Sequence, residues 1–268
     1  MEIQSVKLVC FSPTGTSKKV VQGIAHGMND SNVELIDITL PDARKKALQI
    51  SEDNLFLIAV PVYMGRVPAL LGDWFKNLKA NNTPTVCIVV YGNRAYENAL
   101  LELKDIMTEH GCKVIAGAAY IGEHSFHSKE LPAASIGRPN TNDLDHAKIF
   151  GQKIMEKIYS VSSVDQITDI SIPGNYPYEG ATKLWDVDFI DVNTSCTQCG
   201  FCAENCPSGA INMKESNKID IEKCILCCAC IKNCPQNAKS MKPGLMKDAA
   251  IRVNTLFREN KEPELFLN

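Results

Sequence analysis

The sequence has little net charge and no long apolar run. Its 28 basic and 31 acidic residues, in a chain of 268, leave a formal net charge of −3. This balance excludes a strongly basic nucleic-acid-binding protein and a chain with a strongly acidic disordered tail. No apolar run approaches the roughly 18 residues that a membrane-spanning helix needs. The first ten residues contain neither a basic segment nor a cleavage site, so we expect no signal peptide and a cytoplasmic location.

Cysteine, in contrast, is abundant. The chain has 12 cysteines, and nine of them lie between Cys196 and Cys234. A disulfide framework fits poorly, because the chain is not short and a protein without a leader occupies a reducing compartment. Ligation of a metal or a cluster fits better. The other three, Cys10, Cys87 and Cys112, lie in or beside predicted strands, where small core residues are expected.

The first 160 residues alternate between short β-rich runs and longer stretches with helical spacing. The β-rich runs lie at residues 6–11, 33–38, 55–62, 85–91 and 113–121, and the helical stretches at 17–28, 68–79, 97–110 and 144–159. Two of the β-rich runs are almost entirely apolar, as is typical of strands covered on both faces. The alternation predicts an α/β fold with a doubly wound, five-stranded parallel sheet. Ligands of such a sheet bind beyond the carboxyl ends of its strands.

Residues 161–190 are predicted to form a connector that packs on the domains. The segment holds five acidic residues and one basic residue, two prolines, and four aromatic residues that include Trp185. Proline stiffens a segment and aromatic side chains need a surface to pack on, which favours a strap over a loose tether. Near the end of the chain, residues 245–258 have helical spacing. A helix this short is marginal alone, so we expect it to dock on one of the domains.

The cysteine-rich segment is an internal repeat with a period of 28 residues, from Cys196 to Cys224. Each copy reads C-x2-C-x2-C-x3-C-P. Three thiolates at two-residue gaps surround three corners of a cubane, and the fourth cysteine of each copy ligates the other cluster. A zinc site would instead show two separated C-x2-C pairs. The spacing therefore predicts two [4Fe–4S] clusters. One set of ligands is Cys196, Cys199, Cys202 and Cys234, and the other is Cys224, Cys227, Cys230 and Cys206.

The repeat also assigns the ninth cysteine of this segment. Cys228 aligns with Gly200, so we expect it to be a buried neighbour of a cluster rather than a ligand. On these motifs, residues 190–240 resemble the bacterial-type two-cluster ferredoxins. The resemblance implies a small α+β domain that transfers one electron at a time at low potential.

The loop after the first predicted strand has the composition of a phosphate site. Residues 12–17, Ser-Pro-Thr-Gly-Thr-Ser, precede a predicted helix, whose amino terminus favours an anion. The segment has neither the Walker pattern nor the dinucleotide pattern G-x-G-x-x-G. Taken alone, it is equally consistent with an ordinary Ser/Thr helix cap.

In its place after strand one, this loop resembles the FMN phosphate loop of flavodoxins, S/T-x-T-G-x-S/T. The matching residues are Ser12, Thr14, Gly15 and Ser17, with Thr16 at the free position. The resemblance covers about residues 3–160 and implies that the isoalloxazine lies between the loops after strands three and four. The further cofactor-binding candidates are Pro61, Val62, Tyr63, Met64, Gly65, Tyr91, Gly92, Asn93, Arg94, Tyr96 and, after strand five, Gly122.

Four charged or titratable residues near these loops are candidate catalytic groups. Arg66 and Arg94 stand in the two flavin loops, where they are expected to stabilise negative charge on reduced flavin or to bind a partner's carboxylate. Glu123 and His124 follow strand five and are candidates for a proton relay. For each there is a structural alternative, a solvated arginine or a capping residue. The aperiodic segment up to Asn140 has the length of a lid.

The order of the parts resembles the flavodoxin–ferredoxin fusion proteins of anaerobic bacteria and archaea, often called EFR-type ferredoxins. The stretches P-V-Y-x-G-R-V-P, Y-G-N-R-A-Y and G-E-H-S-F carry this resemblance, together with the cysteine motifs. It implies an FMN domain at 1–160, a connector at 161–190, a two-cluster domain at 191–243 and a helix and tail at 244–268.

Two functions from different classes follow from these parts. One is a carrier that passes electrons between FMN and two [4Fe–4S] clusters and interconverts one- and two-electron transfer. The other is a ferredoxin-dependent flavin reductase of a small molecule such as a quinone, an enone or a nitro compound. Whether the chain is an enzyme is left open. Redox proteins, ferredoxin or its reductase, are the expected partners in both cases, and an oxygen-poor cytoplasm is the expected setting.

Overall fold

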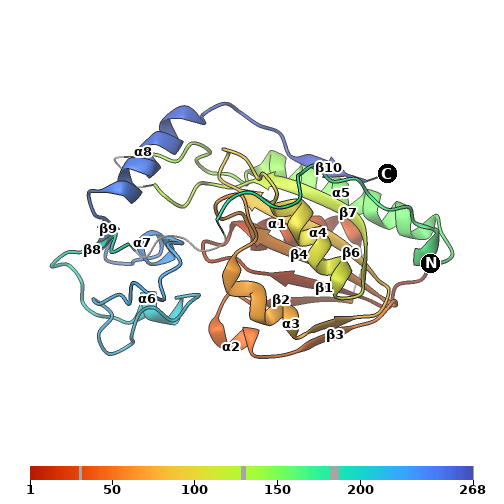
Figure 1. Cartoon of the computed structure of the whole chain (residues 1–268), viewed down its shortest axis with the longest axis horizontal. Helices are drawn as coiled ribbons and strands as arrows, with labels where there is room; N and C mark the ends of the chain where they lie inside the picture. Colours follow the sequence, from red (N-terminus) through yellow and green to blue (C-terminus); the bar gives the residue numbers. More distant parts are fainter. Residues whose placement is uncertain (30–31, 128–130, 182–186, 268) are drawn as a thin grey trace.

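The computed structural model describes residues 1–29, 32–127, 131–181 and 187–267. A larger body is built on a parallel sheet, and a smaller body of short elements meets one edge of that sheet (Figure 1). Within the described residues no helix has both the length and the apolar content to cross a membrane.

Five parallel strands form the sheet of the larger body, as predicted. They are β1 (Ser5–Cys10), β2 (Val33–Asp37), β4 (Asn54–Pro61), β6 (Thr83–Tyr91) and β7 (Cys112–Ile121). Their spatial order is β2-β1-β4-β6-β7, which is the flavodoxin-like order with the switch point beside β1. Strands β4 and β6 are almost wholly buried, because helices cover both faces.

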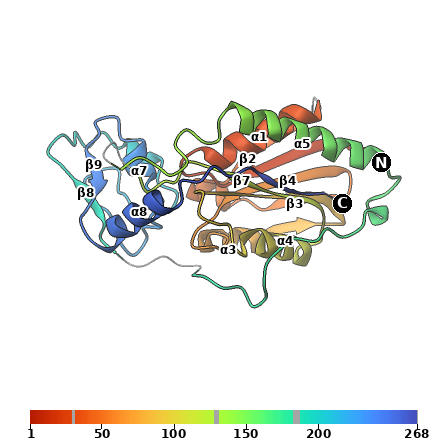
Figure 2. The same cartoon turned by 90° about the horizontal axis from the view of Figure 1, so that it is seen from above.

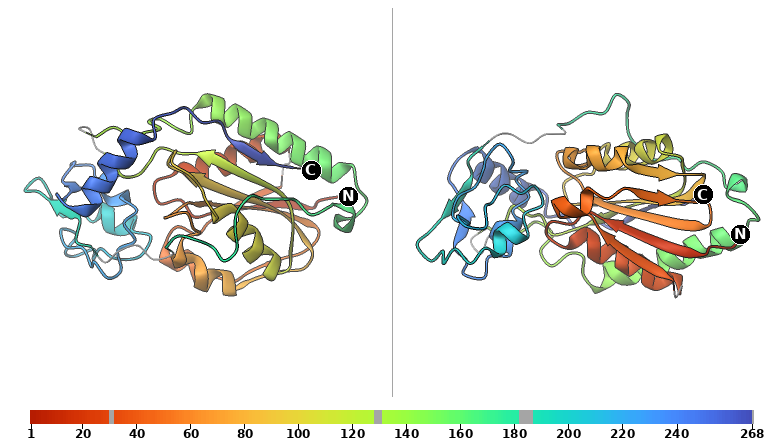
Figure 3. Two further views of the ribbon diagram at one scale, coloured as in Figure 1. Left: turned by 45° about the horizontal axis from the view of Figure 1, so that its top comes forward. Right: turned by 90° about the horizontal axis from the view of Figure 1, so that it is seen from below.

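The predicted strand count was incomplete, because the tail supplies a sixth strand. Strand β10 (Glu264–Phe266) pairs antiparallel with β7, with Leu265 opposite Ala118. Figure 3 shows the tail running along the sheet from helix α8 (Leu245–Leu256) to this strand. The segment is only three residues long and has no periodicity of its own, so its strand character comes from the free edge of β7.

Helices lie on both faces of the sheet (Figure 2). Helices α1 (Thr16–Met28) and α5 (Thr141–Tyr159) cover one face, and α3 (Gly72–Lys76) and α4 (Ala99–Glu109) cover the other. Helices α1 and α5 approach so closely at Gly27 that a Cβ there would lie 1.8 Å from the carbonyl oxygen of Lys148. Glycine at this position lets the two helix backbones touch.

The predicted helix at 68–79 was too long. A 3₁₀ turn at Ala69–Leu71 leads into α3, and β5 (Leu78–Ala80) then pairs in parallel with β3 (Leu48–Ile50). Asn77 ends α3, and Leu78 joins the core as a strand residue. Helix α2 (Pro41–Arg44) completes the larger body.

The smaller body has approximate twofold internal symmetry. It contains the short helices α6 (Phe201–Glu204) and α7 (Ala229–Lys232) and the antiparallel pair β8 (Ile190–Val192) and β9 (Lys239–Met241). Helix α8 packs on it through Met246 and Ala250.

The described part of the connector packs on the larger body. After a 3₁₀ turn at Val164–Gln166, buried Ile170 and Ile172 join the core beside α4. The Tyr178 ring lies 5.0 Å from the Arg66 guanidinium, and its hydroxyl donates to Asp105. Trp185, which contributed to the strap prediction, lies outside the described residues.

Helix α8 is fastened to the segment that follows β7. The fully buried Asn254 accepts a hydrogen bond from the Ala134 amide at 3.0 Å and donates one to the Phe126 carbonyl at 2.5 Å. One side chain thereby joins α8 to two points within the segment that was expected to form a lid.

Replacing Asn254 by alanine removes both hydrogen bonds and leaves two backbone groups without a partner. We expect the Asn254→Ala variant to lose roughly 2 kcal/mol of unfolding free energy, measured by urea denaturation of the holoprotein. Ile251→Ala, at a half-exposed position of the same helix, is the control and should lose much less. Equal losses in the two variants would contradict this role of Asn254.

Candidate functional site

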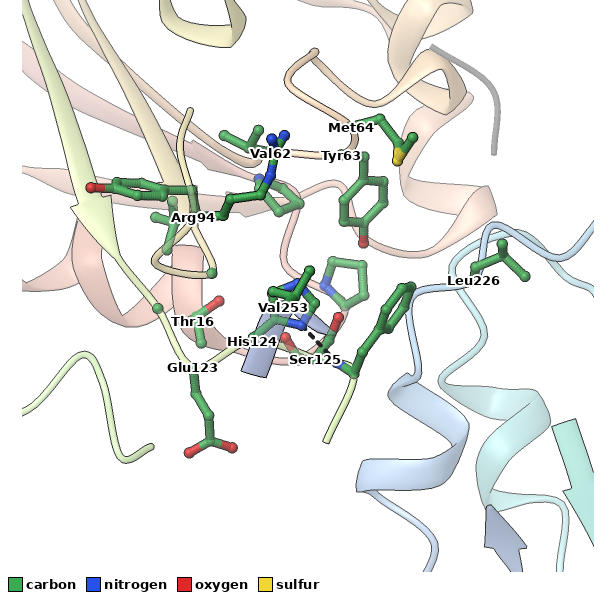
Figure 4. Close-up of a pocket in the computed structure, with 18 of the residues that line it drawn as sticks. Thr16, Val62, Tyr63, Met64, Arg94, Glu123, His124, Ser125, Leu226 and Val253 are labelled. Atoms are coloured by element: carbon green, nitrogen blue, oxygen red, sulfur yellow. Dashed lines mark hydrogen bonds between the residues drawn. The ribbon is translucent and has the colours of Figure 1, made fainter. Parts of the chain in front are cut away.

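A cavity opens where the carboxyl ends of the parallel strands meet the smaller body. It is walled by the loops after β1, β4, β6 and β7, by a residue of the second cysteine motif, and by α8 (Figure 4). The lining residues are Ser12, Pro13, Thr14, Thr16, Ser17, Pro61, Val62, Tyr63, Met64, Gly65, Val90, Tyr91, Gly92, Arg94, Ala95, Gly122, Glu123, His124, Ser125, Phe126, Leu226, Met246, Ala249 and Val253. Thirteen of the sixteen predicted cofactor-binding residues surround this one cavity.

The loop after β1 has the geometry of an anion cradle. Gly15 adopts a left-handed conformation with φ of 86° at the start of α1, and its amide donates to the Ser12 carbonyl. The Ser12 hydroxyl accepts from the Lys18 amide at 3.0 Å, so this serine caps the helix. The Ser17 hydroxyl is fully buried and has no hydrogen-bond partner among the residues that the structure describes.

An unpaired buried hydroxyl at a helix amino terminus fits a phosphate ligand. Burying a polar group without a partner costs free energy, and a phosphate oxygen placed at the amino terminus of α1 would satisfy it. The loop residues therefore fit the phosphate of FMN, with Ser17 as a donor to that phosphate.

The loop after β4 turns tightly beside the cavity. The amide and carbonyl groups of Tyr63 and Arg66 bond reciprocally at 3.0 Å, and Met64 and Gly65 between them have positive φ. A Cβ on Gly65 would lie 1.7 Å from a carboxylate oxygen of Glu97. Glycine therefore allows the loops after β4 and β6 to meet.

Three predicted cofactor-binding residues do not line the cavity. The Asn93 amide donates to the carbonyls of Phe257 and Glu259, and the Tyr96 hydroxyl donates to Glu264 in β10. These two side chains hold the tail. Gly15 shapes the cradle through its backbone without lining the cavity.

Arg66 is not placed to act on a flavin, in contrast to the sequence-based expectation. Its guanidinium forms two hydrogen bonds with Glu102, at 2.9 and 2.7 Å, and Glu102 also accepts from the Val67 amide. This mostly buried pair holds the loop after β4 against α4. Arg94 does line the cavity and pairs with Glu97 at 2.6 Å.

Glu123 links the two bodies, which argues against a proton relay. Its carboxylate contacts the ammonium group of Lys232 at 2.9 Å and the His127 ring at 2.7 Å, and accepts from the Gly137 amide. Burial raises the pKa of Glu123, but the Gly137 amide and Lys232 outweigh burial and leave it below its ordinary value. The carboxylate points away from the cavity centre in Figure 4.

His124 faces the cavity as a neutral imidazole. Burial lowers its pKa to about 4, with smaller contributions from His127 and Arg94. The Phe126 amide donates to Nδ1 at 3.1 Å, so the ring carries its proton on Nε2. His124 can therefore donate one hydrogen bond near neutral pH, but it is not a strong acid there.

The eight predicted ligand cysteines line two separate cavities in the smaller body. Cys196, Cys199, Cys202 and Cys234 surround the first. Cys206, Cys224, Cys227 and Cys230 surround the second, and the ninth cysteine, Cys228, also lines it. These are the crossed sets that the repeat predicts, with the fourth cysteine of each copy in the other copy's cavity.

The backbone around the two cavities repeats with the sequence. The amides of Ala210 and Ala238 both donate to a cysteine sulfur four residues earlier, each at 3.3 Å. Hydrogen bonds from backbone amides to sulfur are a recognised means of stabilising cluster thiolates. The two cavities therefore fit [4Fe–4S] clusters.

Cys228 has a structural place in this repeat. It occupies the left-handed position before α7, with φ of 58°, where the first copy has Gly200 with φ of 79°. Its side chain is 2% exposed and packs with Leu226 and Met246. The packing against α8 explains why a side chain is present where the other copy has none.

Nine cavity residues were not among the predicted site residues, namely Pro13, Val90, Ala95, Ser125, Phe126, Leu226 and the α8 residues Met246, Ala249 and Val253. One signal was present in the repeat. The spacer of the second motif is Ile225–Leu226, whereas the first has Thr197–Gln198. An apolar spacer indicates that the second cluster loop is covered, and Leu226 is 1% exposed.

Comparisons with known proteins match one part of the chain to a family model and find solved structures similar to the other part. Residues 195–238 match the family model of the 4Fe-4S dicluster domain, and no curated protein matches the chain. A flavodoxin from the domain Archaea is 16% identical, with 58% of this chain and 99% of that one covered and a TM-score of 0.41. The flavodoxin of Streptococcus pneumonia TIGR4 is 14% identical, with 57% and 98% covered and a TM-score of 0.40.

The flavodoxin-like assignment of the larger body rests on its strand order. The chain thus joins a flavodoxin-like fold to a 4Fe-4S dicluster domain, which is consistent with a flavodoxin–ferredoxin fusion. The 4Fe-4S dicluster domain indicates an electron-transfer role.

The unpaired hydroxyl of Ser17 makes the phosphate site testable. We expect Ser17→Ala to raise the dissociation constant for FMN roughly tenfold, because a hydrogen bond to a charged group contributes about 1.5 kcal/mol or more. Fluorescence titration of the flavin-free protein measures this constant. Ser163→Ala, at an exposed site in the connector, is the control. An unchanged constant for Ser17→Ala would show that its hydroxyl does not contact the phosphate.

The ligand assignment is tested by two neighbouring cysteines. We expect Cys228→Ala to keep both clusters, of four irons each, because Cys228 serves packing. Cys230→Ala should lose iron from the second cluster, because it removes a ligand. Iron and sulfide analysis of the anaerobically purified variants distinguishes them. Loss of iron from Cys228→Ala alone would reverse the assignment.

Proposed function

We propose that this protein transfers electrons between an FMN bound at the sheet edge and two [4Fe–4S] clusters. The cluster held by Cys206, Cys224, Cys227 and Cys230 exchanges electrons directly with the flavin. FMN exchanges one or two electrons and each cluster exchanges one, so the chain interconverts two-electron and one-electron transfer. The supporting observation is that Leu226, between two ligands of that cluster, lines the same cavity as the phosphate loop.

Tyr63 supports the same order of electron transfer. It lines the flavin cavity, and on its other side it lines a groove together with Cys224. Burial raises the pKa of its phenol well above the ordinary value, and Cys227, Cys228 and Cys224 raise it further. Tyr63 therefore lies between the proposed flavin site and the second set of ligands.

The other cluster is placed for exchange with an external redox protein. Its ligand Cys199 is exposed, and Phe201 and Met213 beside it are about half exposed. The second set of ligands has no exposed member. Electrons would therefore pass between the partner, such as a ferredoxin or its reductase, and the flavin by way of the exposed cluster first.

The carrier fits the site better than the small-molecule reductase. Of the four candidate catalytic residues, Arg66 pairs with Glu102 and Glu123 pairs with Lys232. Three aliphatic side chains of α8 form part of the cavity wall. A wall that is built by the cluster body and α8 favours exchange inside the chain over entry of a small acceptor.

Equivalent ligands of the two repeats provide a matched test of the proposed order of electron transfer. Cys199 and Cys227 occupy the same position of the motif. After photoreduction of the flavin, we expect Cys199→Ala to retain fast reduction of its intact second cluster. Cys227→Ala should reduce its remaining, more distant cluster much more slowly, because the intermediate carrier is impaired.

Rapid-freeze electron paramagnetic resonance measures both rates, after iron and flavin analysis has verified each variant. Equal rates in the two variants would contradict the order. Turnover of a quinone or nitro compound by the isolated chain, at a rate exceeding exchange with ferredoxin, would favour the reductase instead.

A further inference from the structure

A buried lysine stands beside the first cluster cavity. Lys239, in β9, is only 4% exposed, and it lines the cavity formed by the first set of ligands. Its ammonium group donates to the Ser216 carbonyl at 2.9 Å. The sulfur of Cys202 lies 3.6 Å from the same oxygen. One carbonyl oxygen therefore brings the ammonium close to a cluster ligand.

The charge of Lys239 also acts on this neighbouring ligand. Burial raises the pKa of the Cys202 thiol, and the Lys239 ammonium opposes that change.

The repeat shows that packing does not require a lysine here. The aligned residue of the first copy is Ile211, which is 6% exposed. In the part of the chain that the structure describes, no carboxylate lies within ion-pair distance of Lys239, and its acceptor is the neutral Ser216 carbonyl. A buried ammonium without an anion is costly, so a lysine at an apolar position calls for an anionic partner.

We infer that Lys239 is the counter-ion of the first cluster and sets its reduction potential. That cluster with its thiolates supplies the missing negative charge. Reduction adds one electron to the cluster, breaks no bond and transfers no proton. A nearby fixed cation stabilises the reduced cluster more than the oxidised one, so it raises the potential. This inference rests on the cluster part of the proposed function and does not require FMN.

The test replaces the lysine while keeping its unbranched shape. In Lys239→Met we expect the equilibrium constant for reducing the first cluster to fall roughly tenfold, which is a shift of about 59 mV to more negative potential for one electron. Lys242→Met is the matched control. Lys242 lies just beyond the same strand, is more than one-third exposed and pairs with Asp188, so its loss changes net charge equally and should leave both potentials unchanged.

Potentials are measured by spectroelectrochemical titration of the flavin-free chain, so a failure of flavin-to-cluster transfer cannot imitate the result. An unchanged potential of the first cluster in Lys239→Met that retains both clusters would overturn the inference, as would an equal shift in the Lys242→Met control. If Lys239→Met loses iron, Lys239→Arg keeps the charge and should restore it. Loss of iron from both variants would make the shape of the side chain, not its charge, essential and would also overturn the inference.

Discussion

The carboxyl edge of the parallel sheet is the constraint on which the rest of the structure depends. Parallel strands end on one side, so the loops after β1, β4, β6 and β7 must meet there. The same edge carries the amino terminus of α1 and the unpaired Ser17 hydroxyl. These groups fit an anion, and the apolar side chains around them need a cover. The cluster body supplies part of this cover through Leu226.

Several contacts between the two bodies hold this cover in place. Arg44 donates to the Pro207 carbonyl, and Lys232 pairs with Glu123. Asn254 fastens α8, and the tail continues to β10. The charged residues near the cavity therefore have different roles. Glu123 joins the two bodies through Lys232, whereas Arg94 lines the cavity.

The two bodies stabilise negative charge by different groups. The larger body offers backbone amides, a hydroxyl and a helix terminus, which suit a phosphate. The smaller body partly buries most of its thiols, and burial raises the pKa of Cys227 and Cys230 far above the ordinary range of a thiol. Thiolates in such surroundings need compensation, and the amide-to-sulfur hydrogen bonds of Ala210 and Ala238 provide part of it.

The sequence alone determined the parallel sheet, the loop before α1 and the grouping of the cysteines, because each depends on local periodicity or spacing. The strand β10, the pairing of Arg66 with Glu102 and the position of Leu226 depend on residues far apart in the chain. Three residues with no pattern become a strand only beside the free edge of β7. Arg66 is paired because α4 places Glu102 beside it. Only the tertiary structure decides these contacts, because they form between segments that are distant in the sequence and depend on how those segments pack.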